Sequence, residues 1–199
     1  GEILFNGQNI VNYNEDQMRA IRRKMQIIFQ DPYASLNPRM TIGAILEEPL
    51  IIHNLYTIEA DRKTRVRELI DLVGLRPEHL SRYPHEFSGG QRQRIVIAMA
   101  VILQPALLIC DEPTTALDVT IQAQILKLLK DLQAQQNLAL LLITHDLGVV
   151  AEFADRAVVM YAGRAVEVAS VTALYPDRRM PYTAGLLGSS PRLNAPQGT

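Results

Sequence analysis

Two continuous apolar runs separated by a long amphipathic segment constrain the fold of this chain more than any other feature. The runs are Ala106–Cys110 and Leu138–Ile143, and the segment between them, Val119–Gln136, has the length and pattern of a helix. Apolar runs without polar alternation are typical of parallel strands buried on both faces. Strands that alternate with helices build an α/β domain. The sequence therefore predicts an α/β fold with both runs as buried strands of one mostly parallel sheet.

Further segments extend this domain and interrupt it with a helical insertion. The expected strands are Met25–Phe29, Ala157–Tyr161 and Ala165–Val168; the expected helices are Ile42–His53 after the N-cap Thr41, Ile58–Leu72 before Gly74, a helix from Ser88 to about Leu103, and Leu147–Phe153. The helices within about 31–104 break the strand–helix alternation, so we assign them to a helical subdomain. We place the main domain at 1–168 and a C-terminal extension at 169–199.

The opening residues, Gly1–Ile10, predict a hairpin in the middle of a domain. Asn6-Gly7 is a strong two-residue turn signal between short apolar arms. A domain rarely begins so abruptly, so we interpret the chain as a fragment of a longer frame.

Charge and cysteine content exclude several classes of protein. Twenty basic and twenty-one acidic side chains give a net charge of −1, which leaves no global field to attract nucleic acid or an anionic bilayer. The single cysteine, Cys110, excludes a disulfide within the chain and a cysteine-built metal centre, and it fits a reducing cytosol. No apolar run approaches the roughly 20 residues that cross a bilayer. If the protein acts at a membrane, we therefore expect it to dock to something embedded there.

Two adjacent carboxylates, Asp111 and Glu112, follow the first apolar run directly. Ligands of open α/β sheets bind at the carboxyl ends of the strands, where this pair lies. His145 follows the second run and Gln30 follows Met25–Phe29, so both are expected at the same edge. Such a set could hold Mg²⁺ and orient a water against a phosphate. A pair of solvated acids and a structural histidine are the alternative.

A short glycine-containing segment precedes the helix that starts after Ser88. Its residues are Phe87-Ser88-Gly89-Gly90-Gln91. A hydroxyl and unpaired amides at a helix N-terminus suit an oxyanion, because the N–H groups and the helix dipole point at it. In the alternative, Ser88 is an N-cap and the glycines form a turn.

At these residues the sequence resembles the ABC ATPase family. Ser88-Gly89-Gly90-Gln91 is similar to the signature motif, Leu107–Glu112 to the Walker B strand with its catalytic glutamate, Ala116-Leu117-Asp118 to the D-loop, His145 to the switch histidine and Gln30 to the Q-loop glutamine. The resemblance covers nearly the whole chain and implies a P-loop NTPase-like core. Phe87 stands where many members have leucine.

The resemblance also implies the roles of the site residues. ATP and Mg²⁺ are the expected cofactors, with Glu112 as general base, Asp111 and Gln30 at the metal, and His145 near the γ-phosphate. A second ABC subunit, identical or not, would form a head-to-tail dimer that sandwiches two ATP molecules. Ser88, Gly89, Gly90 and Gln91 would then close on the partner's ATP, with Asp118 communicating across the dimer.

Two further stretches are similar to the oligopeptide and dipeptide importers of the family. They are Phe29–Thr41 and, near the end, Pro181-Tyr182-Thr183 with Leu186-Leu187 and Pro191-Arg192-Leu193; Met180 replaces the usual histidine, and the cysteine cluster of some members is not in the sequence. The resemblance implies a peripheral ATPase at the cytoplasmic face of the membrane. Its partners would be transmembrane permease subunits and, indirectly, a peptide-binding protein, with no nucleic acid.

One family motif does not occur in the 199 residues, namely the phosphate loop G-x-x-x-x-G-K-[ST] (Walker A). That loop supplies the amides, the lysine and the hydroxyl that hold nucleotide phosphates and Mg²⁺. We therefore expect the chain by itself to be poorly soluble and not to hydrolyse ATP, as an N-terminally truncated ATPase would. Two alternatives stay open: a non-catalytic module that completes a partner's ATP site, and a soluble ABC ATPase that acts on nucleic acid or ribosomes.

Overall fold

The computed structural model describes residues 1–115, 117–176 and 180–189, and the chain divides into two compact units, Gly1–Ile143 and Thr144–Thr199. The first unit contains β1 (Leu4–Phe5), β2 (Gln8–Asn9), α1 (Glu15–Lys24), β3 (Met25–Ile28), α2 (Ile42–Ile52), α3 (Glu59–Leu72), the 3₁₀ turns η1 (Pro77–Ser81) and η2 (Pro84–Glu86), α4 (Gly89–Val101), β4 (Leu107–Asp111), α5 (Val119–Gln136) and β5 (Ala139–Ile143). The second contains α6 (Leu147–Phe153), β6 (Arg156–Tyr161), β7 (Arg164–Ser170), α7 (Val171–Leu174) and α8 (Pro181–Ser189). The predicted division into a main domain at 1–168 and a C-terminal extension at 169–199 stays a prediction.

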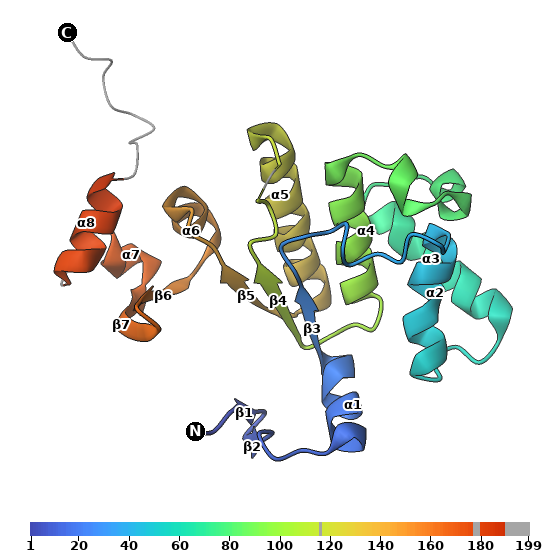
Figure 1. Cartoon of the computed structure of the whole chain (residues 1–199), viewed down its shortest axis with the longest axis horizontal. Coiled ribbons are helices and arrows are strands. Elements are labelled where there is room, and N and C mark those ends of the chain that lie inside the picture. The colour runs from blue at the N-terminus through green and yellow to red at the C-terminus, as the bar shows by residue number, and fades with distance from the viewer. Residues whose placement is uncertain (116, 177–179, 190–199) are drawn as a thin grey trace, which may run out of the picture. The chain divides into compact units, whose positions relative to one another are not determined.

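A parallel sheet in the order β3-β4-β5 forms the centre of the first unit (Figure 1). Ile28 of β3 pairs with Cys110 of β4, and Cys110 pairs with Leu142 of β5. This register brings the carboxyl ends of all three strands to one edge. The structure thus confirms the predicted parallel α/β sheet.

The core of the first unit surrounds β4 and the helices α4 and α5. Leu108 and Cys110 of β4 are fully buried, as are Ile95 of α4 and Ile125 and Leu129 of α5. Burying such side chains stabilises a fold by roughly 1.5–3 kcal/mol each. The first apolar run is therefore a buried central strand, as predicted.

The second apolar run, β5, is not buried as predicted. Leu141 is 50% exposed and Ile143 46% exposed, although both are large apolar residues. The exposed residues alternate along β5, so they share one face of the sheet, on which Ile109 of β4 is also less buried than the residues on either side of it. Edge position alone does not explain this exposure, since β3 is also an edge of the described sheet and its Ile28 is fully buried. The sequence pattern correctly predicted that this run forms a strand, but it wrongly predicted that the strand is buried on both faces.

Helices α2, α3 and α4 gather on the β3 side of the sheet (Figure 1). Their assignment to a separate helical subdomain stays a prediction. Thr41 caps α2 as predicted, since its hydroxyl accepts a hydrogen bond from the Ala44 amide at 3.4 Å. Gly74 follows α3 with φ +74°, a left-handed conformation that glycine adopts without steric cost. Arg62 of α3 pairs with Glu47 of α2 at 2.8 Å and fixes the two helices together.

Helix α1 is an element that the sequence patterns above did not predict. Its N-terminus is a complete capping box: the Asn14 side chain accepts from the Gln17 amide, and the Gln17 side chain accepts from the Asn14 amide. Only Ile21 is buried along its length. The helix leads straight into β3, so it positions the first strand of the sheet.

The opening hairpin forms as predicted. β1 and β2 are antiparallel, with Leu4 opposite Asn9 and Phe5 opposite Gln8. Asn6 and Gly7 both have positive φ, 50° and 78°, which is the backbone of a type I′ turn.

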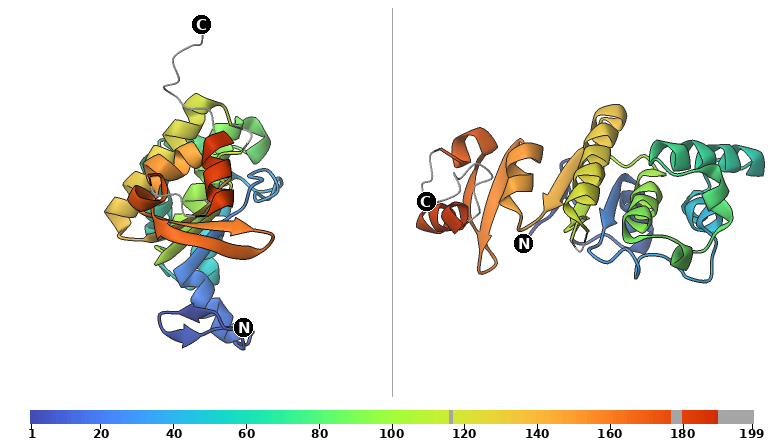
Figure 2. Two further views of the ribbon diagram at one scale, coloured as in Figure 1. Left: turned by 90° about the vertical axis from the view of Figure 1, so that its left-hand side faces the viewer. Right: turned by 90° about the horizontal axis from the view of Figure 1, so that it is seen from above.

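The second unit is built on the predicted hairpin, here β6 and β7, with three short helices (Figure 2). Ala162 and Gly163 form its turn with φ of 46° and 76°. The Tyr175 hydroxyl donates to the Leu147 carbonyl and joins α7 to α6, and burial raises the pKa of this phenol. The ring of Tyr182 in α8 lies 4.6 Å from that of Tyr161 at the end of β6. None of the described helices has the length and apolarity to span a membrane.

Candidate functional site

Gln30 and Glu112 meet at the carboxyl edge of the sheet. Gln30 lies two residues beyond β3 and Glu112 directly follows β4, so the strand pairing brings residues 82 positions apart into contact. The Gln30 amide nitrogen donates a hydrogen bond to the Glu112 carboxylate at 3.0 Å. Thr115 donates its hydroxyl to the same carboxylate oxygen at 2.8 Å. The carboxylate is thereby held in one orientation at the edge where α/β sheets bind ligands.

The backbone of Glu112 is itself unusual. Its φ is +46°, the left-handed region that non-glycine residues rarely adopt. The Glu112 amide donates to the Ile143 carbonyl at 2.9 Å, which fixes the turn to the end of β5. A residue held this way costs about 1–3 kcal/mol, and such strain gathers at functional sites. The backbone conformation that fixes the direction of this carboxylate therefore costs some of the stability of the fold.

Asp111 is the last residue of β4 and lies opposite Ile143 in the register of the sheet. It is half-buried, and the neighbouring Cys110 is fully buried, with a thiol whose pKa burial raises to about 12. Because the Gln30 nitrogen donates to Glu112, the oxygen of the same amide is an acceptor at this edge of the sheet. In the described part of the chain no group of three or more His, Cys, Asp or Glu side chains could hold a metal ion. An amide oxygen and one carboxylate do fit Mg²⁺, which takes its other ligands from water and phosphates.

Ser88 and Gln91 form the N-terminal cap of α4. The Ser88 hydroxyl accepts from the Gln91 amide at 3.4 Å, and the Gln91 side chain accepts from the Ser88 amide at 3.0 Å. Ser88 is thus an N-cap, but Gly89 and Gly90 belong to the helix and do not form a separate turn. The role of the segment toward an anion stays a prediction. Ser88 remains exposed, so the cap leaves its hydroxyl accessible.

Gly89 and Gly90 let α4 begin close against the start of α5. A Cβ atom on Gly90 would lie 2.6 Å from Ile121, closer than real side chains approach, and one on Gly89 would lie 3.6 Å from Leu117. Asp118 caps α5 by accepting from the Ile121 amide at 3.0 Å. The structure therefore brings the signature-like segment and Asp118 together, while Ala116 lies outside the described residues.

His145 belongs to the second unit, directly after Thr144. It is exposed and precedes Asp146, which caps α6 by accepting from the Gly148 and Val149 amides. Its role beside Gln30 and Glu112 stays a prediction.

Two contacts near the site were not predicted from the sequence. Thr115 was not identified, although a hydroxyl three residues after Glu112 in a Pro-Thr-Thr turn could have drawn attention to it. The guanidinium of Arg92 lies 5.0 Å from the ring centroid of Tyr33 and also donates to the Pro84 carbonyl. This cation–π contact joins the loop after Gln30 to α4. It depends on two residues 59 positions apart in separate elements.

The parallel sheet with polar side chains gathered at its carboxyl edge defines an open α/β ligand-binding domain. A family model described as ABC transporter matches residues 1–115, so the chain belongs to the ABC transporter family. This confirms the predicted family and fold.

Curated relatives are similar along nearly the whole chain. The oligopeptide transport ATP-binding protein AppF of Bacillus subtilis is 51% identical over 192 residues, which is 96% of this chain and 58% of that protein. The oligopeptide transport ATP-binding protein OppD of Mycobacterium tuberculosis is 53% identical over 202 residues, which is 100% of this chain and 33% of that protein. The predicted resemblance to oligopeptide importers is confirmed, and the chain spans between about a third and three fifths of these relatives.

A solved structure shares the fold. It is the dimeric post-hydrolysis state of the ATP-binding cassette MJ0796 bound to ADP and Pi, with a TM-score of 0.76 and 28% identity. The match covers 86% of this chain and 73% of that one. The similarity extends beyond the residues of the family model.

Proposed function

We propose that this chain carries the hydrolytic and signature residues of an ATPase subunit that powers import of oligopeptides or dipeptides. The observation that carries the proposal is the Gln30–Glu112 hydrogen bond at the carboxyl edge of the sheet. It supplies an oriented carboxylate next to an amide, which suits the activation of a water that attacks a phosphate. ATP is the nucleotide that family membership supports.

Each side chain at this edge has a distinct proposed role. Glu112 accepts the proton of the attacking water, and Gln30 with Thr115 holds its carboxylate in position. Asp111 and the Gln30 oxygen would hold Mg²⁺, which neutralises charge on the phosphates when it is bound. His145 would contact the γ-phosphate.

The signature-like segment acts on a second subunit in this proposal. Ser88, Gly89, Gly90 and Gln91 would close on the ATP of the partner, and Asp118 would sense that closure through the packing of α4 against α5. The dimeric state of the similar ATP-binding cassette MJ0796 supports a two-subunit arrangement. Whether the second subunit is identical is left open.

The transported substrate class follows from the relatives. Oligopeptide and di/tripeptide transport ATP-binding proteins are about 49–54% identical to this chain. We infer a peripheral position at the cytoplasmic face of the membrane, against permease subunits that receive peptide from a binding protein. Tyr33, exposed in the loop after Gln30, lies in the segment that most resembles these importers.

Two experiments separate the proposed roles. In the first, the phosphate-loop segment of an oligopeptide relative is fused before Gly1, and Mg²⁺-dependent ATP turnover is measured. We expect turnover that falls about 10²–10⁴-fold in Glu112→Gln, while Asp131→Asn, an exposed acid paired with Lys127, keeps it. Unchanged turnover in Glu112→Gln rules out the assigned base.

In the second, the unmodified chain is mixed with a relative whose own signature serine is replaced but whose phosphate loop is intact. Restored turnover that needs Ser88 supports the signature role. Because the 199 residues contain no phosphate-loop sequence, the unmodified chain alone is expected not to turn over ATP. Restoration here combined with no effect of Glu112→Gln in the fusion would favour the non-catalytic module.

A further inference from the structure

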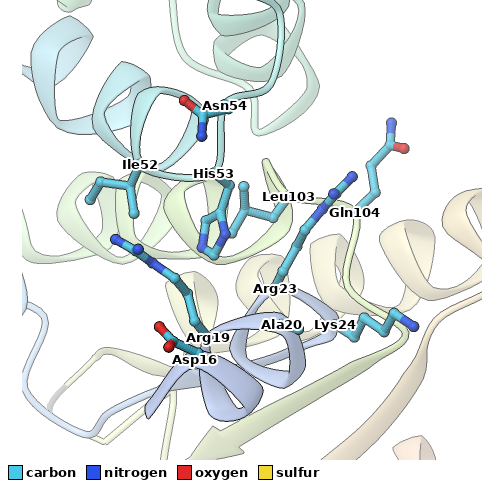
Figure 3. Close-up of a pocket in the computed structure, with 10 residues that line it drawn as sticks. All are labelled: Asp16, Arg19, Ala20, Arg23, Lys24, Ile52, His53, Asn54, Leu103 and Gln104. Atoms are coloured by element: carbon cyan, nitrogen blue, oxygen red, sulfur yellow. The ribbon is translucent and has the colours of Figure 1, made fainter.

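A basic cavity lies in the first unit, formed by residues other than those around Gln30 and Glu112. Its volume is about 620 Å³, and it is bounded by α1, by the end of α2 and by the residues that follow α4 (Figure 3). The lining residues that bear on its chemistry are Asp16, Arg19, Arg23, Lys24, His53 and Gln104. A volume of this size lies within the range of small-molecule sites.

The charge of the lining is strongly positive. Arg19, Arg23 and Lys24 face the cavity against one carboxylate, Asp16. Arg19 and Arg23 are four residues apart on one helix face, where like charges destabilise the helix. Within the described residues none of these three cations makes an ion pair.

The neighbouring Arg22 is placed differently. It pairs with Glu15 at 3.1 Å and does not line the cavity. The helix thus has one arginine paired with a carboxylate and two arginines that line the recess without an ion pair among the described residues. This difference leaves an excess of positive charge at the recess.

The opposite wall contributes a donor rather than an acid. His53 caps the end of α2, and its ring points toward α1 between the guanidinium groups of Arg19 and Arg23 (Figure 3). Burial, then Arg19 and Arg23, lower the pKa of this imidazole. The ends of α2 and α4 carry negative partial charge, yet their last carbonyls already accept the His53 and Gln104 amides.

We propose that this cavity binds a small phosphorylated anion, held by Arg19 and Arg23 with Lys24 at its rim. Guanidinium groups bind phosphate oxygens through paired hydrogen bonds, and two of them extend here from successive turns of α1, one on each side of the His53 ring (Figure 3). Binding removes the repulsion between the arginines and joins α1, which precedes β3, to the ends of α2 and α4. The site is independent of the proposed ATPase role, because it shares no residue with it.

The test uses the chain as it stands, with inorganic pyrophosphate as the probe. We expect saturable binding by calorimetry, weakened at least tenfold in the double variant Arg19→Gln with Arg23→Gln. The matched control, Arg22→Gln on the same helix, should stay within about twofold. These side chains are exposed, so each variant should keep the fold. Circular dichroism and the urea midpoint measure whether it does.

A second readout locates the probe at this cavity. The ring signals of His53, followed by NMR against pH, should show its pKa rising when pyrophosphate binds, because the anion opposes the arginines. A rise that disappears in the double variant supports the proposal. No binding at millimolar pyrophosphate, binding that the double variant leaves unchanged, or a His53 pKa that does not move would each overturn it.

Discussion

The adjacent strands β4 and β5 are alike in sequence and different in surroundings. Both are continuous apolar runs in one parallel sheet, and they pair residue for residue from Leu107 and Ala139 onward. On one face, Leu108 and Cys110 of β4 are fully buried while their pairing partners in β5 are only half-buried. On the other face, Leu141 and Ile143 of β5 are about half exposed. An apolar run therefore specifies a strand that needs cover, but it does not specify which neighbours provide the cover.

This difference also separates two kinds of strand end. β4 continues into Asp111 and the strained Glu112, where a rigid, covered strand can hold a costly backbone conformation. β5 is an edge strand within the described sheet, and exposed apolar edges promote association between chains. The buried strand β4 can therefore hold the strained backbone of Glu112, whereas the exposed strand β5 favours contacts with other chains.

The largest expected effect compares one thiol on each strand. In the variant Leu141→Cys, the new thiol on β5 is half exposed, while Cys110 on β4 is buried with a pKa of about 12 instead of 9.0. Because the thiolate reacts, Cys110 should alkylate about a thousandfold more slowly at equal access, and burial slows it further. Iodoacetamide labelling followed by peptide mass spectrometry measures both rates in one protein. Equal rates in the folded state would contradict the comparison; equal rates in urea are the control.

The next effect is on stability. Leu108→Ala should lower the free energy of unfolding by about 2–5 kcal/mol, because it removes a fully buried side chain from a packed core. Leu141→Ala removes the same atoms from a half-exposed site and should cost less than about 1.5 kcal/mol. Urea unfolding followed by circular dichroism gives both values. If the two substitutions cost the same, β5 is covered in solution by something outside the described residues.

A charge on the exposed strand should affect association more than folding. Leu141→Lys places an ammonium group on the edge strand, where charged side chains oppose edge-to-edge pairing. We expect higher solubility, measured by light scattering against concentration, with a stability change within about 1 kcal/mol. Val119→Lys, an exposed residue at the start of α5, is the control for added charge alone. Equal gains in solubility from both variants would mean that β5 is not the surface responsible.

The smallest expected effect is on the pH dependence of stability. It comes from a buried histidine that lies outside both strands. His79 is buried, its ring packs edge-on against Phe87, and its Nδ1 accepts the Arg76 amide at 3.2 Å. Burial, then Arg82 and Arg76, lower its pKa, so below the ordinary value of 6.5 the unfolded chain binds a proton that the folded chain does not. Stability should therefore be greatest above pH 6.5 and fall as the pH drops below it.

Urea midpoints between about pH 5 and 8 measure this dependence. His79→Gln should flatten it, while His85→Gln, at an exposed ring stacked on Tyr83, should not. A slope that persists in His79→Gln would assign the titration to another group.

Most elements of the fold could be predicted from the sequence because their signals are local. Thr41, Ser88 and Asp118 cap helices through their own side chains, and Asn6-Gly7 forms its turn without outside help. Helix α1 carries an equally local signal in Asn14 and was overlooked. The burial of β5 could not be predicted, because it depends on what covers each face of the sheet at that strand.

The candidate site was predictable only as far as strand order determines it. Parallel strands bring their carboxyl ends together, so the meeting of Gln30 and Glu112 follows from the fold class. The hydrogen bond from Thr115 is local, because Thr115 lies three residues after Glu112. The contact of Arg92 with Tyr33 and the basic cavity depend on packing between separate segments. No spacing in the sequence reports these contacts.

The cap at the start of α4 has a consequence for the proposed contact with a phosphate. The Ser88 hydroxyl and the Gln91 side chain already satisfy each other's backbone amides. In both bonds the side chain is the acceptor, so the Ser88 hydroxyl keeps its own O–H group as a donor. In the proposed role, that O–H group would bind an incoming phosphate while the serine cap, worth about 0.5–2 kcal/mol, stays in place. The end of the helix would then need no rearrangement when a partner presents its γ-phosphate.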